Sequence, residues 1–272
     1  MNDIRPRELA RKIRIHALRM VHRSKASHIG TCFSMADLLA VLYDKVLNLD
    51  PSNPGWAERD RFILSKGHGA AIYYAVLAEC GFFPTHWLDT YCQNGSRLAG
   101  HVTKYETPGI EVSTGSLGHG LPIGCGMALV GNREKKEYRI IVMLSDGELN
   151  EGSNWEAILF ASQHHLDNLI AIVDYNEIQG LGSVHEIIGL EPLINKFQSF
   201  GWGTREIDGH DLDQISNSFK EIPFNKGKPT LIIAHTVKGK GVSFMENNFA
   251  WHYQSPNDDE LILALAELQK TT

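Results

Sequence analysis

Cysteine is sparse in this sequence, and long apolar runs are missing from it. The four cysteines, Cys32, Cys80, Cys92 and Cys125, form no CxxC pair, which argues against a zinc site and against a disulfide framework. No apolar run approaches the roughly 18 residues of a transmembrane helix, and the charged N-terminal segment lacks the apolar core of a signal peptide. We therefore expect a cytoplasmic protein without a membrane partner.

Positive charge is also in short supply. The formal net charge of −6 argues against bulk attraction to nucleic acid or to an anionic membrane surface. The length of 272 residues allows one large domain or two small ones. Because the sequence has no interdomain linker, internal repeat or low-complexity tract, residues 1–272 are expected to form a single domain.

Apolar segments alternate with helical patterns along the chain. Continuously apolar segments predict strands that are buried on both faces at 140–144, 169–173 and 231–235. Shorter strands are expected at 62–64 and 203–207. Helices are expected at 5–25, 34–46, 70–80, 119–132, 155–164, 191–199, 211–221 and 258–269. This alternation is typical of an α/β fold, namely a doubly wound parallel sheet flanked by helices.

Two polar residues follow neighbouring apolar segments and could share a site. Asp146 follows 140–144 and Asn176 follows 169–173, and ligands of open α/β sheets bind beyond the carboxyl ends of the strands. Carboxylate and amide oxygens suit Mg²⁺ or Ca²⁺, Gly147 would let a diphosphate approach the backbone, and a helix starting near Asn154 would direct free N–H groups at that anion. The alternative, that these residues only cap helices and turns, stays open at this point.

The segment around Asp146 resembles a known motif. Asp146-Gly-x3-Glu-Gly-x2-Trp-Glu-Ala, followed by Asn176, is similar to the thiamine diphosphate motif of transketolases. Further segments of that family occur in the same order at Ala26–Gly30, Arg61–His68, Gly100–His101 and Thr114–Gly120. The resemblance covers roughly residues 7–252 and corresponds to the N-terminal, diphosphate-binding half of a transketolase. The chain departs from the family pattern at Ile29, Lys66, Ser116, Ser145 and Tyr175.

The resemblance implies thiamine diphosphate as cofactor, together with Mg²⁺ or with Ca²⁺ or Mn²⁺ in its place. The implied metal ligands are the side chains of Asp146 and Asn176 and the backbone carbonyl of Ile178. The residues implied to contact the cofactor are His68, Gly115, Leu117, Gly147, Glu151 and Asn176.

Three further histidines are implied to act on the substrate. His28, His101 and His252 would face a ketose, donate hydrogen bonds to its hydroxyl groups and move protons as the C–C bond breaks, which suits the near-neutral pKa of histidine. A lone histidine is more often structural, but these three follow the order of the family. The implied reaction transfers a two-carbon ketol unit from a ketose or ketose phosphate to an aldose or aldose phosphate.

The other half of a transketolase has no counterpart in this sequence. In the family, that half carries the glutamate that activates the aminopyrimidine ring of the cofactor. The resemblance therefore implies a split enzyme, in which a separate C-terminal subunit supplies that glutamate and the assembly is an α2β2 heterotetramer. Glu151 would act in catalysis by pairing with it across the interface, although an acidic residue in the first turn of a helix is also favoured by the helix dipole.

Two other interpretations remain open. The chain could be a subunit of another thiamine diphosphate enzyme, either a deoxyxylulose-phosphate synthase or a 2-oxoacid dehydrogenase. It could also be a non-catalytic, cofactor-binding half. The sequence Asn150-Glu151-Gly152 and the histidines at 28, 68 and 101 favour a transketolase.

Overall fold

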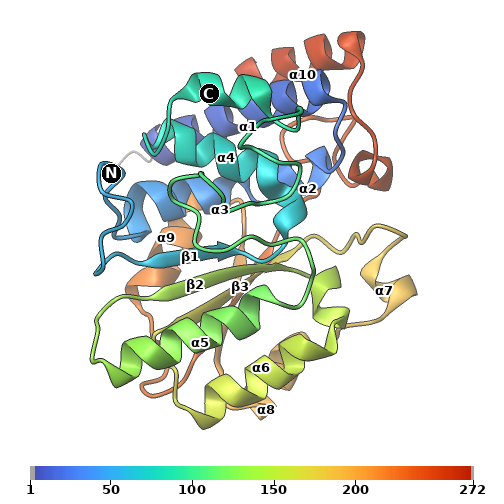
Figure 1. Ribbon diagram of the computed structural model, residues 1–272. Coiled ribbons are helices and arrows are strands. Elements are labelled where there is room, and N and C mark those ends of the chain that lie inside the picture. Colours follow the sequence, from blue (N-terminus) through green and yellow to red (C-terminus); the bar gives the residue numbers. More distant parts are fainter. Residues whose placement is uncertain (1–3, 271–272) are drawn as a thin grey trace.

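The computed structural model describes residues 4–270, and its centre is a parallel sheet of five strands in the order β1-β2-β3-β5-β4 (Figure 1). The strands are β1 (Arg61–Leu64), β2 (Ile140–Ser145), β3 (Leu169–Tyr175), β4 (Gly203–Asp208) and β5 (Thr230–His235). Every predicted strand is present, and the predicted α/β fold with a parallel sheet flanked by helices is confirmed.

Helices cover both faces of this sheet (Figure 1). One face carries α1 (Ile4–Ser24), α2 (Ile29–Ser34), α3 (Ala36–Val41), α4 (Ala70–Glu79), α9 (Leu212–Lys220) and α10 (Asp258–Lys270). The other face carries α5 (Gly120–Arg133), α6 (Gly152–Gln163) and α8 (Leu193–Ser199). Shorter helical segments are η1 (Leu42–Val46), η2 (Gly67–Gly69), η3 (Thr85–Thr90), η4 (Gly147–Asn150), α7 (Val184–Ile187) and η5 (Phe249–His252).

The strands divide their side chains between two apolar cores. In β2, Ile141 and Met143 pack with the first group of helices, whereas Val142 and Leu144 pack with the second group. All of these side chains are fully buried, because successive residues of a strand point to opposite faces and both faces are covered. This is why the strands were recognisable as continuously apolar segments.

The helix expected over 34–46 differs most from the prediction. It is divided into α2, α3 and the π-helical segment η1, and it begins earlier, at Ile29. Met35 (φ −96°, ψ 6°) separates α2 from α3. Side chains are buried on every side of α2 and on nearly every side of α3, so the sequence there has no amphipathic period that could mark where each piece begins.

The topology has two switch points at the carboxyl ends of the strands. The chain leaves β1 and β2 toward opposite faces, through α4 and α6, and it leaves β3 and β5 toward opposite faces, through α8 and α10. Ligands of open α/β sheets bind at such switch points. Among residues 4–270, no helix is both long enough and apolar enough to span a membrane.

Candidate active site

A cavity of about 320 Å³ lies at the carboxyl ends of the strands, at the lower end of the range of small-molecule sites. It is lined by His28, Thr31, His68, His101, Gly115, Leu117, Ser145, Asp146, Gly147, Asn176, Ile178, Gln179, Gly180, Lys238 and His252. The structure thus brings together all of the predicted site residues except Glu151.

Asp146 forms the deepest acidic group of this cavity and is 2% exposed. One carboxylate oxygen accepts a hydrogen bond from the Gly147 amide (2.6 Å), and the other accepts bonds from the amides of Asn176 (3.0 Å) and Glu177 (2.7 Å). The capping role left open by the sequence therefore exists. The bonds from Asn176 and Glu177 also hold Asp146 against the segment after β3 that carries the other two predicted metal ligands, Asn176 and Ile178.

The electrostatics of Asp146 fit a cation site. Burial, together with the nearby charge of Asp174, raises the pKa of the Asp146 carboxyl group to about 6. A bound cation would offset this penalty on the carboxylate. Asn176 and Ile178 line the same cavity, and the side-chain oxygen of the first and the carbonyl of the second are hard oxygen atoms of the kind that Mg²⁺ prefers. The residues present therefore fit a magnesium ion shared with phosphate oxygens.

Lys238 is a cationic group of the cavity that the sequence motifs did not single out. Its ammonium donates a hydrogen bond to the Ile178 carbonyl (2.8 Å) and lies 3.1 Å from Nδ1 of His252. Burial and the charge of Lys66 lower the pKa of Lys238 to about 8. The segment Thr236–Gly241 resembles a thiamine-enzyme motif, but its sequence does not indicate that Lys238 turns inward.

Four imidazole rings line the cavity and lie close together. The ring of His28 lies 5.2 Å from that of His68, 5.8 Å from that of His101 and 4.9 Å from that of His252, measured between centroids. His28 has a left-handed backbone (φ 74°) and its amide donates to the carbonyl of His252. Such strain is found where surrounding structure enforces it, often at functional sites. The predicted grouping of these histidines is therefore present.

Acid is expected to remove the stability that the neutral His28 and His252 rings contribute to the ligand-free chain between about pH 6.5 and pH 4. Burial, with neighbouring positive groups, lowers the pKa of His28 to about 4 and that of His252 to about 3. Below pH 6.5 the unfolded chain therefore binds more protons at these two histidines than the folded chain does. Their contribution to the free energy of unfolding is fully present above pH 6.5 and is lost as the pH drops toward 4. Urea unfolding of a His28→Gln/His252→Gln variant should show a shallower loss than the wild type. A His164→Gln control at an exposed site should not, and equal slopes in all three proteins would contradict the prediction.

The loop between α4 and α5 is held against the end of β1. The Val102 amide donates to the Gly67 carbonyl (3.1 Å), and the Thr114 amide donates to the Val102 carbonyl (3.0 Å). Gly67 tolerates no side chain, because an added Cβ would lie 2.5 Å from the backbone of Thr114. Gly115 has a φ of +144°, and its Cβ would meet the His101 ring at 3.0 Å. These contacts place His101, Gly115 and Leu117 on the cavity.

Glu148 is a further buried residue that sequence reasoning missed. Its side chain is 0% exposed and accepts hydrogen bonds from the Ser65 hydroxyl and from the amides of Gly118 (2.9 Å) and Ser145 (3.3 Å). It thereby joins the ends of β1 and β2 to the loop that carries Leu117. The carboxylate was visible in the Asp146 motif, but its inward orientation was not.

The position of Glu151 and the first residue of α6 differ from those predicted from the sequence. Glu151 is exposed and lies outside the cavity, with its Cβ and Cγ against Gly118. The helix predicted from Trp155 begins at Gly152, after η4. Because no residue of α6 lines the cavity, the proposed contact of its N-terminus with a bound anion is not supported. The amide next to Asp146 belongs to Gly147, at the start of η4.

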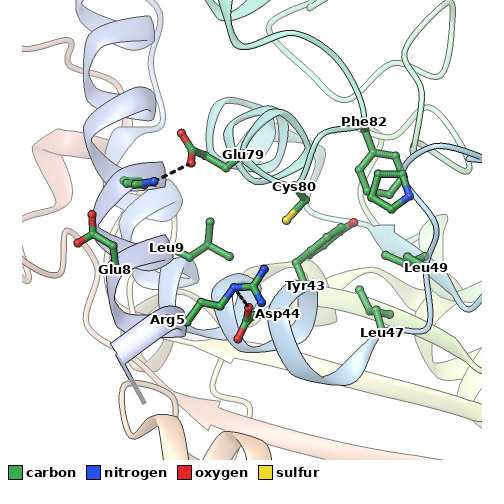
Figure 2. Close-up of a pocket in the computed structure, with 12 residues that line it drawn as sticks. Arg5, Glu8, Leu9, Tyr43, Asp44, Leu47, Leu49, Glu79, Cys80 and Phe82 are labelled. Carbon is green, nitrogen blue, oxygen red and sulfur yellow. Dashed lines mark hydrogen bonds and ion pairs between the residues drawn. The ribbon is translucent and has the colours of Figure 1, made fainter. Parts of the chain in front are cut away.

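A larger cavity, of about 720 Å³, lies apart from the predicted site (Figure 2). It lies between the first turns of α1 and the end of α4, which runs back from the carboxyl end of β1. Its side chains include the Arg5–Asp44 ion pair and an apolar floor that contains Tyr43, Leu47 and Phe82. None of the predicted site residues lines it.

The sheet is parallel, and a cavity suited to a metal ion and to phosphate groups lies beyond the carboxyl ends of its strands. This arrangement defines a cofactor-binding α/β domain. The family model described as "Transketolase, thiamine diphosphate binding domain" matches residues 6–268. The chain therefore belongs to this family, which confirms the resemblance seen in its motifs.

Individual relatives agree with this assignment. An apulose-4-phosphate transketolase subunit of Actinobacillus succinogenes is 46% identical, over 89% of this chain and 87% of its own. The 6-deoxy-6-sulfo-D-fructose transketolase subunit SqwG of a Clostridium species is 42% identical, over 96% of this chain and 95% of its own. The solved transketolase of Leishmania mexicana superposes with a TM-score of 0.91 at 32% identity, covering 97% of this chain but only 41% of that one.

Proposed function

We propose that this chain is the N-terminal subunit of a two-chain, thiamine diphosphate-dependent transketolase. It would transfer a two-carbon ketol unit from a ketose or ketose phosphate to an aldose or aldose phosphate. The observation that carries the proposal is the cavity in which four histidines face Asp146, Asn176 and Ile178. Relatives of matching length are named as transketolase subunits, which supports both the activity and the split organisation.

The cavity residues have distinct roles in this proposal. Mg²⁺, or Ca²⁺ or Mn²⁺ in its place, would be held by Asp146, Asn176 and the carbonyl of Ile178. The residues that would contact thiamine diphosphate are His68, Gly115, Leu117, Gly147 and Asn176. When bound, the cofactor supplies the carbanion that accepts and releases the two-carbon unit.

The remaining histidines would act on the sugar. His28, His101 and His252 line the cavity, where imidazole rings can donate hydrogen bonds to hydroxyl groups and take up a proton as the C–C bond breaks. Burial, which lowers the pKa of His28 and His252, keeps both rings neutral at physiological pH. Both rings are therefore in the unprotonated form that can accept a proton, but their lowered pKa makes them weaker bases than the near-neutral pKa of an ordinary histidine would.

A partner subunit would complete the site. Glu151 would pair with the partner's activating glutamate, and the assembly would be an α2β2 heterotetramer in the cytoplasm, with residues 1–272 as one domain. Exposed apolar side chains on α5 and α6, the second of which begins directly after Glu151, support docking on this side of the sheet. They include Val130, which is 48% exposed, and Leu159, which is 58% exposed.

Co-expression with the protein encoded by the neighbouring open reading frame tests this function. The two chains are expected to co-purify and to transfer ketol units only together, with thiamine diphosphate and Mg²⁺ present. Ketol transfer by the isolated chain at ordinary rates would contradict the split-enzyme proposal. Pyruvate decarboxylation by the pair would favour a deoxyxylulose-phosphate synthase or a 2-oxoacid dehydrogenase, and cofactor binding without any turnover would favour a non-catalytic half.

A further inference from the structure

A buried ion pair lies beneath the candidate active site. Lys66 and Asp174 contact each other directly, and both side chains are 0% exposed. Lys66 belongs to the turn that follows β1, and Asp174 belongs to β3. None of the roles proposed for the cavity uses either residue, and charged groups are rarely buried this completely without a specific reason.

Asp174 collects hydrogen bonds from three separate segments of the chain. One carboxylate oxygen accepts from the Lys66 ammonium and from the Ser34 hydroxyl, and the other accepts from the Thr236 hydroxyl. Lys66 in turn donates to the hydroxyl of Thr31 at 2.6 Å. Burial alone would raise the pKa of Asp174, but Lys66 and these hydroxyl donors hold it below its ordinary value.

Each of these segments also carries a residue of the cavity. Lys66 precedes His68 by two residues, Asp174 precedes Asn176 by two, and Thr236 precedes Lys238 by two. The fourth segment is α2, which begins directly after His28 and contains Thr31 and Ser34. The carboxylate of Asp174 therefore connects the four pieces of backbone that present His28, His68, Asn176 and Lys238 to a ligand.

We propose that Asp174 is a positioning residue of the active site, which sets the relative placement of these four segments for Mg²⁺ and thiamine diphosphate through Lys66, Ser34 and Thr236. The inference rests on the proposed function, because it takes the diphosphate and its metal as the ligands. Asp174 touches neither ligand in this account. Its effect is transmitted by short stretches of backbone that hold the contacting groups.

The expected size of the effect follows from comparable sites. Groups that orient a metal ligand typically change metal affinity or activity by 10- to 100-fold when they are removed. Loss of one hydrogen bond to Asp174 leaves the ion pair in place, so the protein should still fold. The dissociation constant of the cofactor should nevertheless rise by roughly tenfold.

The first test uses two threonine-to-valine variants in the full chain. Thr236→Val removes one hydrogen bond to Asp174 with little change in volume. Thr230→Val is the matched control, because Thr230 begins β5 at its other end and its buried hydroxyl has no hydrogen-bond partner within the described residues. Isothermal titration with thiamine diphosphate at saturating Mg²⁺ should give a dissociation constant about tenfold higher for Thr236→Val. Thr230→Val should bind as the wild type does.

A second variant separates positioning from stability. Removing only Lys66 or only Asp174 leaves a buried charge without its partner and is expected to unfold the chain, whereas the double variant Lys66→Met/Asp174→Leu removes both charges. Its thermal unfolding temperature should return close to that of the wild type, while its cofactor affinity stays at least tenfold weaker. Wild-type affinity in both the double variant and Thr236→Val would overturn the inference. Failure of the wild-type chain to bind thiamine diphosphate with Mg²⁺, both alone and together with its partner subunit, would instead contradict the proposed function.

Discussion

Asp146→Ala is expected to abolish the Mg²⁺-dependent binding of thiamine diphosphate to this chain. Asp146 is the one carboxylate among the three proposed metal ligands, and Mg²⁺ in phosphate sites relies on one or two carboxylates together with phosphate oxygens. The variant also loses three backbone hydrogen bonds that connect Gly147, Asn176 and Glu177. Titration calorimetry should show a dissociation constant raised by more than about a hundredfold, beyond the range for groups that merely support a ligand.

Asp146→Asn separates the metal contact from the structural one. The asparagine oxygen can still accept the hydrogen bonds from the amides of Asn176 and Glu177, whereas the NH2 group in place of the other oxygen gives up the bond from the Gly147 amide. The asparagine side chain carries no charge to attract the metal. Because burial already raises the pKa of Asp146 to about 6, removing its charge should not lower the thermal unfolding temperature of the ligand-free chain. The variant should therefore fold normally and still lose Mg²⁺-dependent binding. Normal binding in both variants would show that Asp146 has only its capping role.

The sequence was sufficient to predict the sheet and the floor of the site. Strands buried on both faces are continuously apolar, so β2, β3 and β5 were recognisable without tertiary information. Asp146 and Asn176 could then be placed together, because parallel strands present their carboxyl ends at one edge of the sheet. Their expected proximity depends only on β2 and β3 being neighbours, and these strands pair in register from Ile140–Leu169 to Ser145–Asp174.

Long-range side-chain partners could not be predicted in this way. Lys66 and Asp174 are 108 positions apart in the sequence, and no local pattern indicates that a lysine and an aspartate will be buried together. Asp174 lies one position beyond the strand expected over 169–173, yet it continues the ladder of β3 opposite Ala234. The inward turns of Lys238 and Glu148 were missed for the same reason. Pairing across the fold, rather than local propensity, determines where these charged side chains lie.

Glu151→Gln is expected to reduce the turnover of the assembled two-chain enzyme by about 10²- to 10⁴-fold, the range for loss of a group involved in proton transfer. The same substitution should leave binding of thiamine diphosphate and Mg²⁺ to the isolated chain unchanged. This combination follows from its position, since Glu151 is exposed and lies outside the cavity. We therefore expect Glu151 to interact with a group that another chain supplies.

The alternative role of Glu151, as a charge at the start of α6, makes a different prediction. Glu151 is the N-cap of α6, but its side chain makes no capping hydrogen bond within the described part of the chain. A favourable interaction with the helix dipole would then be worth about 0.3–1 kcal/mol, and its loss would lower the unfolding temperature slightly without affecting turnover. Glu156→Gln is the matched control, because Glu156 is also exposed and lies on α6. Equal activity of the two variants would favour the helix role, whereas loss of turnover in Glu151→Gln alone, at unchanged stability, requires a partner group across the interface.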